Sequence, residues 1–179
     1  MQIQNVGVVG CGLMGSGIAQ IAAQAGMSVH VLEVDDAACN KGRSKIEGFL
    51  GKAVERGKMT ADQVKEIVGR ITFTSKREDL KACDLVIEAI IENLEIKQEL
   101  FAALDKICPA HTIFASNTSS LAIGDMAAAT QRPERFVGLH FFNPVPLMKL
   151  VEVVRTLETS DEVFDASCVF GEKVGKTVV

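Results

Sequence analysis

The fold of this chain follows from its opening run, Val6-Gly7-Val8-Val9-Gly10-Cys11-Gly12-Leu13-Met14-Gly15. A short β-branched segment that ends in Gly-x-Gly-x-x-Gly is typical of a buried parallel strand whose following helix receives a pyrophosphate on its N-terminus. The first glycine permits a tight turn, the second lets the backbone approach the phosphates, and the third lets the helix pack closely. Backbone amides and the helix dipole then face the anion together, so no basic side chain is needed. We therefore predict cofactor contacts at Gly10, Cys11, Gly12, Leu13, Met14 and Gly15.

A second predicted strand with an acidic end selects among cofactors. Ser28–Leu32 reads as that strand, and it is followed by Glu33, which comes 23 residues after Gly10. A carboxylate at this spacing accepts hydrogen bonds from both hydroxyls of the adenosine ribose and repels a 2′-phosphate. The combined pattern favours NAD over NADP. Two alternatives stay open: FAD, which uses the same pattern, and a glycine turn that only packs a helix against a sheet.

Length and composition limit the kinds of protein that this chain can be. A chain of 179 residues with 47% hydrophobic and 23% charged residues is enough for one globular domain with a substantial core. The net charge of −4 gives no general attraction for nucleic acid. Apolar runs are too short to span a membrane, and we expect no targeting segment before the first strand. The absence of tyrosine excludes a dehydrogenase that uses a Tyr-x-x-x-Lys base.

The cysteines indicate a reducing compartment. They are odd in number and lack the Cys-x-x-Cys spacing that is typical of zinc sites. We therefore expect reduced thiols, a cytoplasmic protein and no metal site. The five are Cys11, Cys39, Cys83, Cys108 and Cys168.

Helical and extended segments alternate through the first 128 residues. After Glu33, helices over 37–56 and 60–68 should form a helical hairpin, with Gly57 as a C-terminal cap and a capping box from Thr60 to Gln63. Further strands are predicted at 71–74, 84–90 and 112–115, and further helices at 93–107 and up to about residue 128. This alternation predicts an α/β fold with a doubly wound, mostly parallel Rossmann-like sheet. Ligands should then bind at the carboxyl ends of the strands, where Gly10, Glu33, Glu92 and Ser119 fall.

The pattern changes after residue 135. Two extended segments, 136–142 and 148–154, are separated by only five residues, which is too short for a parallel crossover, so they should pair antiparallel. A turn centred on Pro146 places His140 opposite Glu152, since each lies six residues away. A carboxylate that faces a histidine can fix the ring tautomer and raise the basicity of the other nitrogen. The alternative is an ordinary polar pair on a sheet surface.

The end of the sequence bears on domain organisation. A last helix is predicted from about residue 161 to 174, and a strand follows over 175–179. The chain stops inside that strand. We therefore expect residues 1–179 to form one NAD-binding domain of a longer protein.

Two further segments carry a resemblance to a known family. They are Ser116-Asn117-Thr118-Ser119-Ser120-Leu121 and Gly138-Leu139-His140-Phe141-Phe142-Asn143-Pro144, the latter followed by Met148-Lys149-Leu150-Val151-Glu152-Val153. With the glycine turn, they make the whole chain resemble the N-terminal NAD-binding domain of the L-3-hydroxyacyl-CoA dehydrogenases, of the 3-hydroxybutyryl-CoA dehydrogenase type. The resemblance implies NAD-dependent interconversion of an L-3-hydroxyacyl-CoA and its 3-oxoacyl-CoA, as in fatty acid β-oxidation and butanoate metabolism.

The resemblance also implies catalytic roles. His140 would be the base that takes the proton from the 3-hydroxyl group, and Glu152 would orient its ring and balance the imidazolium charge that forms. Ser119 would hydrogen-bond the reacting oxygen, and Asn143 would line the same pocket; both would also lie beside the cofactor. Ser119 is alternatively a helix cap, and Asn143 a turn residue before Pro144.

Further cofactor contacts follow from the same resemblance. Glu92 and Lys97 match positions that contact the nicotinamide half of the cofactor, and Glu33 matches the acid that holds the ribose. The alternative for Lys97 is an exposed residue on a helix surface.

Substrate contacts depart from the family pattern. Family members hold the CoA phosphates on the long helix of the hairpin with a small polar residue and a lysine, and the matching positions here are Phe49 and Arg56. Arginine can replace lysine at a phosphate, but a phenyl ring cannot donate a hydrogen bond. We predict CoA contacts at Lys52 and Arg56, with a solvated helix face as the alternative.

The family carries a second, all-helical domain that supplies an active-site asparagine, a wall of the acyl pocket and the dimer interface. We therefore expect an acyl-CoA substrate and, for the complete protein, a homodimer, with neither nucleic acid nor membrane as partner. Two rival hypotheses remain. The chain by itself is a dinucleotide-binding module without catalysis, or the substrate is a free 3-hydroxy acid, which Phe49 favours.

Overall fold

The computed structural model describes residues 2–179, and its strands form one sheet with the order β3-β2-β1-β4-β5-β6-β7-β8. The strands are β1 (Asn5–Val9), β2 (Ser28–Leu32), β3 (Ile71–Thr74), β4 (Leu85–Glu88), β5 (Ile113–Ser116), β6 (Phe136–Phe141), β7 (Leu150–Arg155) and β8 (Thr177–Val178). The α-helices are α1 (Leu13–Gln24), α2 (Asp36–Glu55), α3 (Ala61–Gly69), α4 (Leu94–Asp105), α5 (Ile123–Ala127) and α6 (Asp161–Lys173). Two 3₁₀ helices, η1 (Arg77–Ala82) and η2 (Pro133–Arg135), complete the chain.

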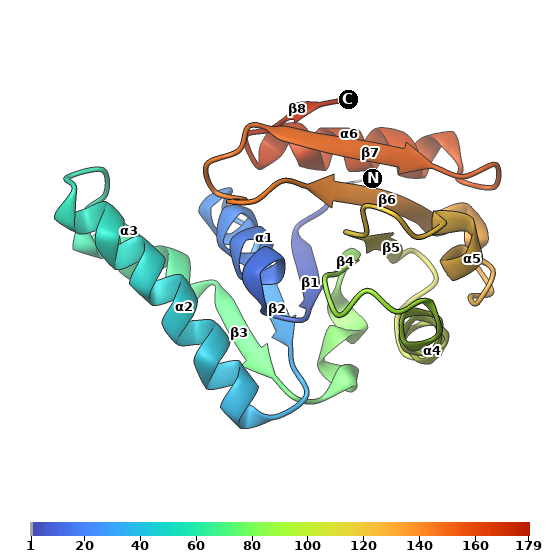
Figure 1. Cartoon of the computed structure of the whole chain (residues 1–179), viewed down its shortest axis with the longest axis horizontal. Helices are drawn as coiled ribbons and strands as arrows, with labels where there is room; N and C mark the ends of the chain where they lie inside the picture. Colours follow the sequence, from blue (N-terminus) through green and yellow to red (C-terminus); the bar gives the residue numbers. More distant parts are fainter. Residues whose placement is uncertain (1) are drawn as a thin grey trace.

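The sheet is wound in both directions from its middle (Figure 1). β1 pairs in parallel with β2 on one side and with β4 on the other, so the winding reverses between β1 and β4. The pairs β2–β3, β4–β5 and β5–β6 are also parallel. This confirms the predicted doubly wound α/β fold. In such sheets the crevice for a ligand lies beyond the carboxyl ends of the strands at the reversal point.

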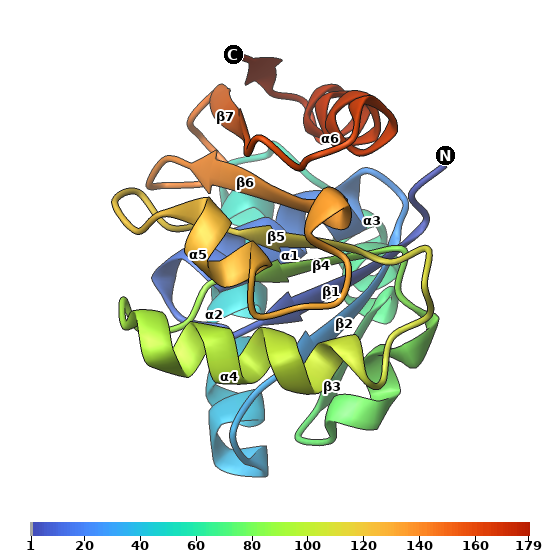
Figure 2. The ribbon, with the colours of Figure 1, turned by 90° about the vertical axis from the view of Figure 1, so that its right-hand side faces the viewer.

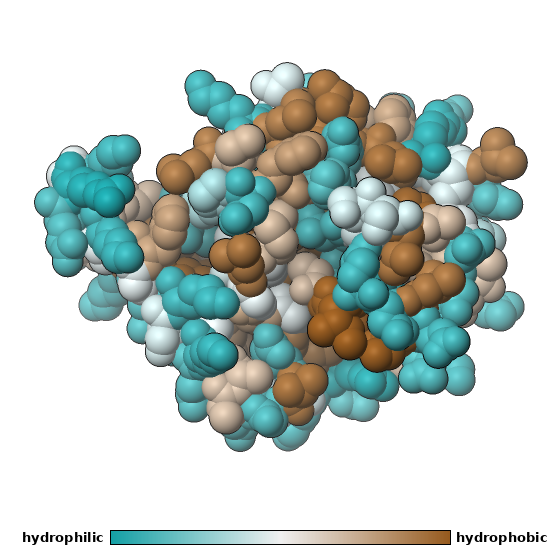
Figure 3. All heavy atoms as spheres, in the orientation of Figure 1, coloured by the Kyte–Doolittle hydropathy of each residue, from teal (hydrophilic) through white to brown (hydrophobic). Residues whose placement is uncertain are grey.

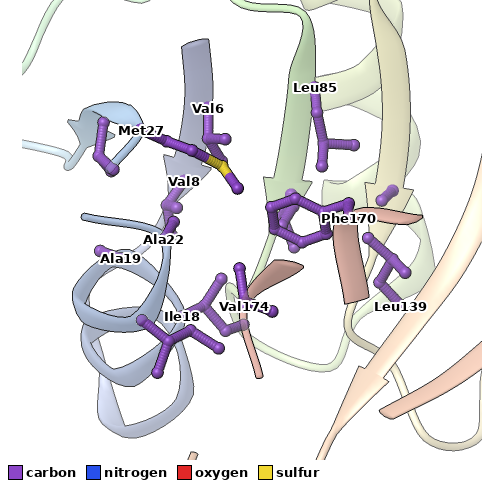
Figure 4. Close-up of a cluster of buried hydrophobic side chains, with 14 of the residues drawn as sticks. Val6, Val8, Ile18, Ala19, Ala22, Met27, Leu85, Leu139, Phe170 and Val174 are labelled. Carbon is purple, nitrogen blue, oxygen red and sulfur yellow. The ribbon is translucent and has the colours of Figure 1, made fainter. Parts of the chain in front are cut away.

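Helices cover both faces of the sheet, as the turned view in Figure 2 shows. On one face Ile18 of α1, Ile46 of α2, Ile67 of α3 and Phe170 of α6 belong to a single buried cluster. Figure 4 shows Ile18 and Phe170 of this cluster. The other face is covered by α4 and α5. There, Phe101 of α4 lies at the centre of an aromatic group, 4.6 Å from the ring of Phe136 and 5.7 Å from that of Phe114.

Alternation along β1 explains why this strand lies in the middle. Val6 and Val8 join the first cluster and Val9 joins the second, and all three are at most 5% exposed. A fully buried valine or leucine contributes about 1.5–3 kcal/mol. Gly7 completes the strand where a Cβ atom would lie only 3.1–3.3 Å from Val86, Leu80 and Cys83.

The predicted helical hairpin is confirmed as α2 and α3. Asp35 caps α2 by accepting a hydrogen bond from the Ala38 backbone N–H, and Gly57 ends the turn at φ +67°. Thr60 and Gln63 form both hydrogen bonds of the capping box at the start of α3. The hairpin projects from the left of the sheet in Figure 1, and Figure 3 shows that its outer end is largely hydrophilic.

The antiparallel pair near the C-terminus is also confirmed, with the predicted register. β6 and β7 pair antiparallel, and His140 lies opposite Glu152. The strands are shorter at the turn than expected, because residues 142–149 form a loop that contains a cis peptide bond between Asn143 and Pro144. The buried Lys176 holds this loop through hydrogen bonds from Nζ to the Val145 and Met148 carbonyl oxygens at 2.5 and 2.6 Å.

Other element ends differ from the sequence-based expectation for local reasons. β4 ends at Glu88 and not at residue 90, because the Glu88 carboxylate accepts a hydrogen bond from the Ile90 N–H and turns the chain. The predicted final strand shrinks to β8, which pairs with β7 in parallel after the crossover through α6. The 3₁₀ helices η1 and η2 were not expected at all.

The cysteines and the helices of the described residues 2–179 bear on two expectations about the whole chain. All five cysteines in that range are free thiols. Over the same range, none of the helices combines the length and the apolar character that crossing a bilayer requires.

Candidate active site

The glycine turn has the geometry that its sequence predicts. Gly10 adopts φ +87°, and a Cβ atom on Gly15 would lie 1.8 Å from the Gly10 carbonyl oxygen. Gly12 faces open space, because a Cβ atom placed there would find no atom within 4 Å among the described residues. Within residues 2–179, no side chain caps the N-terminus of α1, and the first turn of α1 carries no acidic residue. This helix end therefore fits an anion such as a pyrophosphate.

Glu33 lies beside this turn, directly after β2. Its Oε1 accepts a hydrogen bond from the Cys11 backbone N–H, and the Gly10 N–H donates to the Leu32 carbonyl oxygen at 2.9 Å. The Cys11 amide is thus already engaged by Glu33, so the amides that remain for an anion begin after it. Burial, with a smaller contribution from the charge of Glu33, raises the pKa of the Cys11 thiol to about 12, so the thiol stays protonated.

A cavity of about 350 Å³, here called the Glu33 cavity, lies on the β2 side of the turn. The exposed Val34 and the cationic Arg77 are among its lining residues. A cavity with mainly apolar walls, beside an acidic residue at the end of β2, suits the adenosine half of a dinucleotide. Its lining consists of Val9, Gly10, Leu32, Glu33, Val34, Ser75, Arg77, Ile90, Ile96, Glu99 and Leu100.

A second cavity, of about 430 Å³ and here called the His140 cavity, lies on the β4–β5 side of the same turn. Six predicted site residues meet there, although they come from α1, α4, β6 and the loops after β4, β5 and β6. These are Met14, Glu92, Lys97, Ser119, His140 and Asn143. The remaining lining residues are Ala89, Ile90, Asn117, Phe141 and Phe142.

His140 is held by its partner strand. Its Nδ1 lies 2.6 Å from Glu152 Oε2, across the β6–β7 pair. The carboxylate can only accept, so Nδ1 carries the proton and Nε2 is the nitrogen that can accept a proton. Phe142 packs against the imidazole with ring centroids 4.6 Å apart. Asn117 fixes the end of β6, since its Oδ1 accepts a hydrogen bond from the Phe141 N–H at 3.0 Å.

Lys97 is buried, and the alternative of an exposed helix residue is therefore wrong. Only 1% of its side chain is exposed, and Nζ lies 2.8 Å from both Glu88 Oε1 and Glu92 Oε2. Thr118 donates a further hydrogen bond to Glu92. Partial burial raises the pKa of Glu92, but hydrogen bonds from Lys97 and Thr118 together outweigh it and lower that pKa below its ordinary value. Glu92 is thus held as a carboxylate at the mouth of the cavity.

The predicted site residues Ser119 and Asn143 both lie at the His140 cavity. Helix α5 begins at Ile123 with Ala122 as its N-cap residue, so Ser119 does not cap it. The exposed Ser119 side chain lines the His140 cavity instead. Asn143 lies in the loop after β6, directly before Pro144, and it also lines this cavity.

Lys52 and Arg56 lie apart from the His140 cavity. Together with Lys58 and Phe49, they line a separate cavity of about 380 Å³, here called the Arg56 cavity, between the hairpin and the loop after β6. A smaller cavity of about 100 Å³ is lined by both Phe49 and Asn143. It therefore shares Asn143 with the His140 cavity, and it shares Gln20, Phe49 and Pro146 with the Arg56 cavity.

Comparison with known proteins identifies the family. The family described as 3-hydroxyacyl-CoA dehydrogenase, NAD binding domain, matches residues 5–179. The chain belongs to this family. The resemblance predicted from the glycine turn and the two later segments is thereby confirmed.

Individual relatives agree with this family. A probable 3-hydroxybutyryl-CoA dehydrogenase of Bacillus subtilis is 49% identical over 179 residues, which is 100% of this chain and 62% of that protein. The crystal structure of (S)-3-hydroxybutyryl-CoA dehydrogenase PaaH1 from Ralstonia eutropha matches with a TM-score of 0.97 at 41% identity, over 99% of this chain and 63% of that one. The structure of a diketoreductase matches with a TM-score of 0.91 at 32% identity, over 100% of this chain and 64% of that one. The chain thus spans about three fifths of the length of these relatives.

Several polar residues of this dehydrogenase domain were missed by sequence reasoning. Glu88 is fully buried, and it accepts hydrogen bonds from Lys97 and from Ser116. Asn117 and Thr118 hold the loop beside the cavity. A signal for Glu88 exists in the sequence, since an acidic residue that ends an otherwise apolar central strand must find donors when the strand is buried.

Proposed function

We propose that this chain binds NAD and performs the proton transfer of an L-3-hydroxyacyl-CoA dehydrogenase of the 3-hydroxybutyryl-CoA type. The observation that carries this proposal is the His140–Glu152 pair at 2.6 Å, which lines a cavity beside the glycine turn. The complete protein would interconvert an L-3-hydroxyacyl-CoA and its 3-oxoacyl-CoA.

The residues present fit a dinucleotide. The uncapped N-terminus of α1 would hold the pyrophosphate, and Glu33 would accept hydrogen bonds from the adenosine ribose in the Glu33 cavity. The nicotinamide half would then reach the His140 cavity on the other side of the reversal point, beside Glu92 and Lys97. NAD, when bound, supplies the acceptor for the hydride that leaves carbon 3 of the substrate.

His140 would act as the base. With Nδ1 held by Glu152, Nε2 would take the proton from the 3-hydroxyl group, and the carboxylate would balance the imidazolium charge that forms. Ser119 would donate a hydrogen bond to the reacting oxygen, and Asn143 would help to orient the acyl group. In the opposite direction, His140 would return the same proton to the 3-oxo oxygen.

The substrate would extend from the His140 cavity past Asn143 toward the hairpin. Lys52 and Arg56 would meet the CoA phosphates in the Arg56 cavity, which is rimmed by cationic side chains. Phe49, which is 37% exposed, would offer the substrate an apolar contact in place of a hydrogen bond.

Replacing His140 tests the proposal. His140→Gln in the complete protein should lower the turnover of acetoacetyl-CoA and NADH by about 10²–10⁴-fold, the usual contribution of a positioned acid or base, while NADH binding stays near the wild-type value. His111→Gln is a matched control, because His111 is half-exposed and pairs with Asp84 away from the cavity. Unchanged turnover in His140→Gln would refute the mechanism.

Two rival functions are separated by simple assays. If the chain is a dinucleotide-binding module without catalysis, these 179 residues should bind NADH but should not turn over acetoacetyl-CoA. A dehydrogenase of a free 3-hydroxy acid is favoured by Phe49 at the position where the family has a polar residue, and by the likeness to a diketoreductase. Turnover of the free acid that exceeds turnover of the CoA thioester would establish the second rival.

A further inference from the structure

Glu88 is a buried carboxylate at the end of the central strand β4, and the proposed proton transfer does not use it. Its Oε1 accepts hydrogen bonds from Lys97 Nζ and from the Ile90 backbone N–H, both at 2.8 Å. Its Oε2 accepts one from Ser116 Oγ at 2.6 Å. Burial of an ionised carboxylate is costly unless it is paired and hydrogen-bonded, and here both conditions are met.

The pairing gives the local network a definite charge. Lys97 bridges Glu88 and Glu92, with 2.8 Å from Nζ to one oxygen of each. Lys97 and Glu92 both line the His140 cavity, and by themselves their charges would cancel. The Glu88 side chain lies behind them and is 0% exposed, and its charge brings the net charge of these three side chains to −1. The net charge of the group formed by Glu88, Lys97 and Glu92 is therefore set by Glu88, a residue that does not line the cavity, and it adds to the negative charge of Glu152 on His140.

A net negative charge distinguishes the two redox states of the cofactor. The nicotinamide ring is a cation when oxidised and neutral when reduced, so a nearby negative charge stabilises only the oxidised ring. A buried charge is screened by salt much less than a surface charge. We propose that Glu88 is a positioning residue that acts through Lys97 and biases the His140 cavity toward the oxidised nicotinamide. This rests on the proposed function, which places the nicotinamide half in that cavity.

Glu88→Gln tests the proposal, because it keeps the shape of the side chain and an acceptor for Lys97 but removes one charge. Calorimetric titration of the chain with NAD⁺ and with NADH should show the ratio of the two dissociation constants, NAD⁺ over NADH, rising by about tenfold, as expected for a unit charge about 10 Å away at an effective dielectric of about 20. This equals an upward shift of about 30 mV in the potential of the bound two-electron couple.

Two variants separate charge from structure. Ser116→Ala removes a hydrogen bond from the same carboxylate without changing the charge, and Glu88→Asp keeps the charge, so both should leave the ratio at the wild-type value even where both affinities fall. If Glu88→Gln does not fold, Glu92→Gln removes a charge from the exposed end of the network and should raise the ratio in the same direction.

The outcomes are distinct. A ratio that rises in the Gln variants and stays constant in Ser116→Ala supports the proposal. Equal losses of affinity for NAD⁺ and NADH in Glu88→Gln would reduce Glu88 to a structural residue and overturn this inference alone. Failure of the wild-type chain to bind either form would overturn the proposed function, and this inference with it.

Discussion

The negative charge of Glu152 should contribute measurably to the turnover rate of the proposed reaction. Glu152→Gln is the sharpest perturbation, because the amide oxygen can still accept the hydrogen bond from His140 Nδ1 while the negative charge is lost. The ring is therefore expected to keep its place and tautomer. What disappears is the carboxylate that would balance the imidazolium formed when Nε2 takes a proton.

The magnitude follows from the geometry. The Nδ1 to Oε2 distance of 2.6 Å is that of a short hydrogen bond to a charged group, which typically contributes about 1.5–3 kcal/mol, against about 0.5–1.5 kcal/mol for a neutral one. Because Glu152→Gln keeps the bond and removes only the charge, the expected loss is the difference, about 1–1.5 kcal/mol. The Glu152 side chain is 44% exposed, so water screens it in part and the upper end of that range is not expected. At about 1.36 kcal/mol per tenfold change in rate, turnover should fall by between about fivefold and about tenfold.

The assay is the oxidation of NADH by acetoacetyl-CoA in the complete protein, with the dissociation constant of NADH measured alongside. Glu158→Gln is the control, because Glu158 is an exposed acid shortly after the same strand. In a double-mutant cycle, adding Glu152→Gln to His140→Gln should cause no further loss, since Glu152 acts only through the histidine. A single-variant loss below about twofold, or a full additional loss in the double variant, would refute the reasoning.

Two further predictions concern the turn and the loop after β6. Gly15→Ala should weaken NADH binding by more than about tenfold, because the new Cβ atom would lie 1.8 Å from the Gly10 carbonyl oxygen. Gly48→Ala is the control: it lies on the open face of α2, so it should leave NADH binding unchanged and stabilise the fold by about 1 kcal/mol. Lys176→Met should lower the free energy of unfolding by about 2–4 kcal/mol, because the buried Val145 carbonyl oxygen and the partly buried Met148 carbonyl oxygen lose their donor. Burial lowers the pKa of Lys176 in the folded protein below its ordinary value of 10.5. Between the lowered pKa and 10.5 the unfolded chain therefore binds more protons than the folded one, so the stability of the wild type relative to Lys176→Met should rise as the pH approaches 10.5. Denaturant titrations at several pH values that showed stability falling over this range would contradict the prediction.

Much of the fold was predictable because its signals are local. The glycine turn, the apolar strands and the caps at Thr60 and Gly57 each depend on a few neighbouring residues, and each was found where expected. Element ends were less predictable. β4 stops at Glu88 because its side chain bonds the backbone two residues on, and such a side-chain contact leaves no periodic pattern in the sequence.

For the candidate site, the predictable part was again a matter of spacing. His140 and Glu152 belong to one hairpin, so counting from the turn gave their register. Lys97 is the opposite case. Its position on α4 allowed an exposed side chain as well as a buried one, and only the packing of α4 against the end of β4 buries it between Glu88 and Glu92.

The sequence by itself determined the class of fold, the NAD-binding turn and the facing histidine and carboxylate, because each is specified by residues close together in the chain. The tertiary structure alone decided that Lys97 is buried between Glu88 and Glu92 beside the cavity at the carboxyl ends of the strands, and that Glu88 lies behind it. The physical reason is that the charge beside this cavity depends on which side chains lose their water when separate segments pack together, and no single segment carries that information.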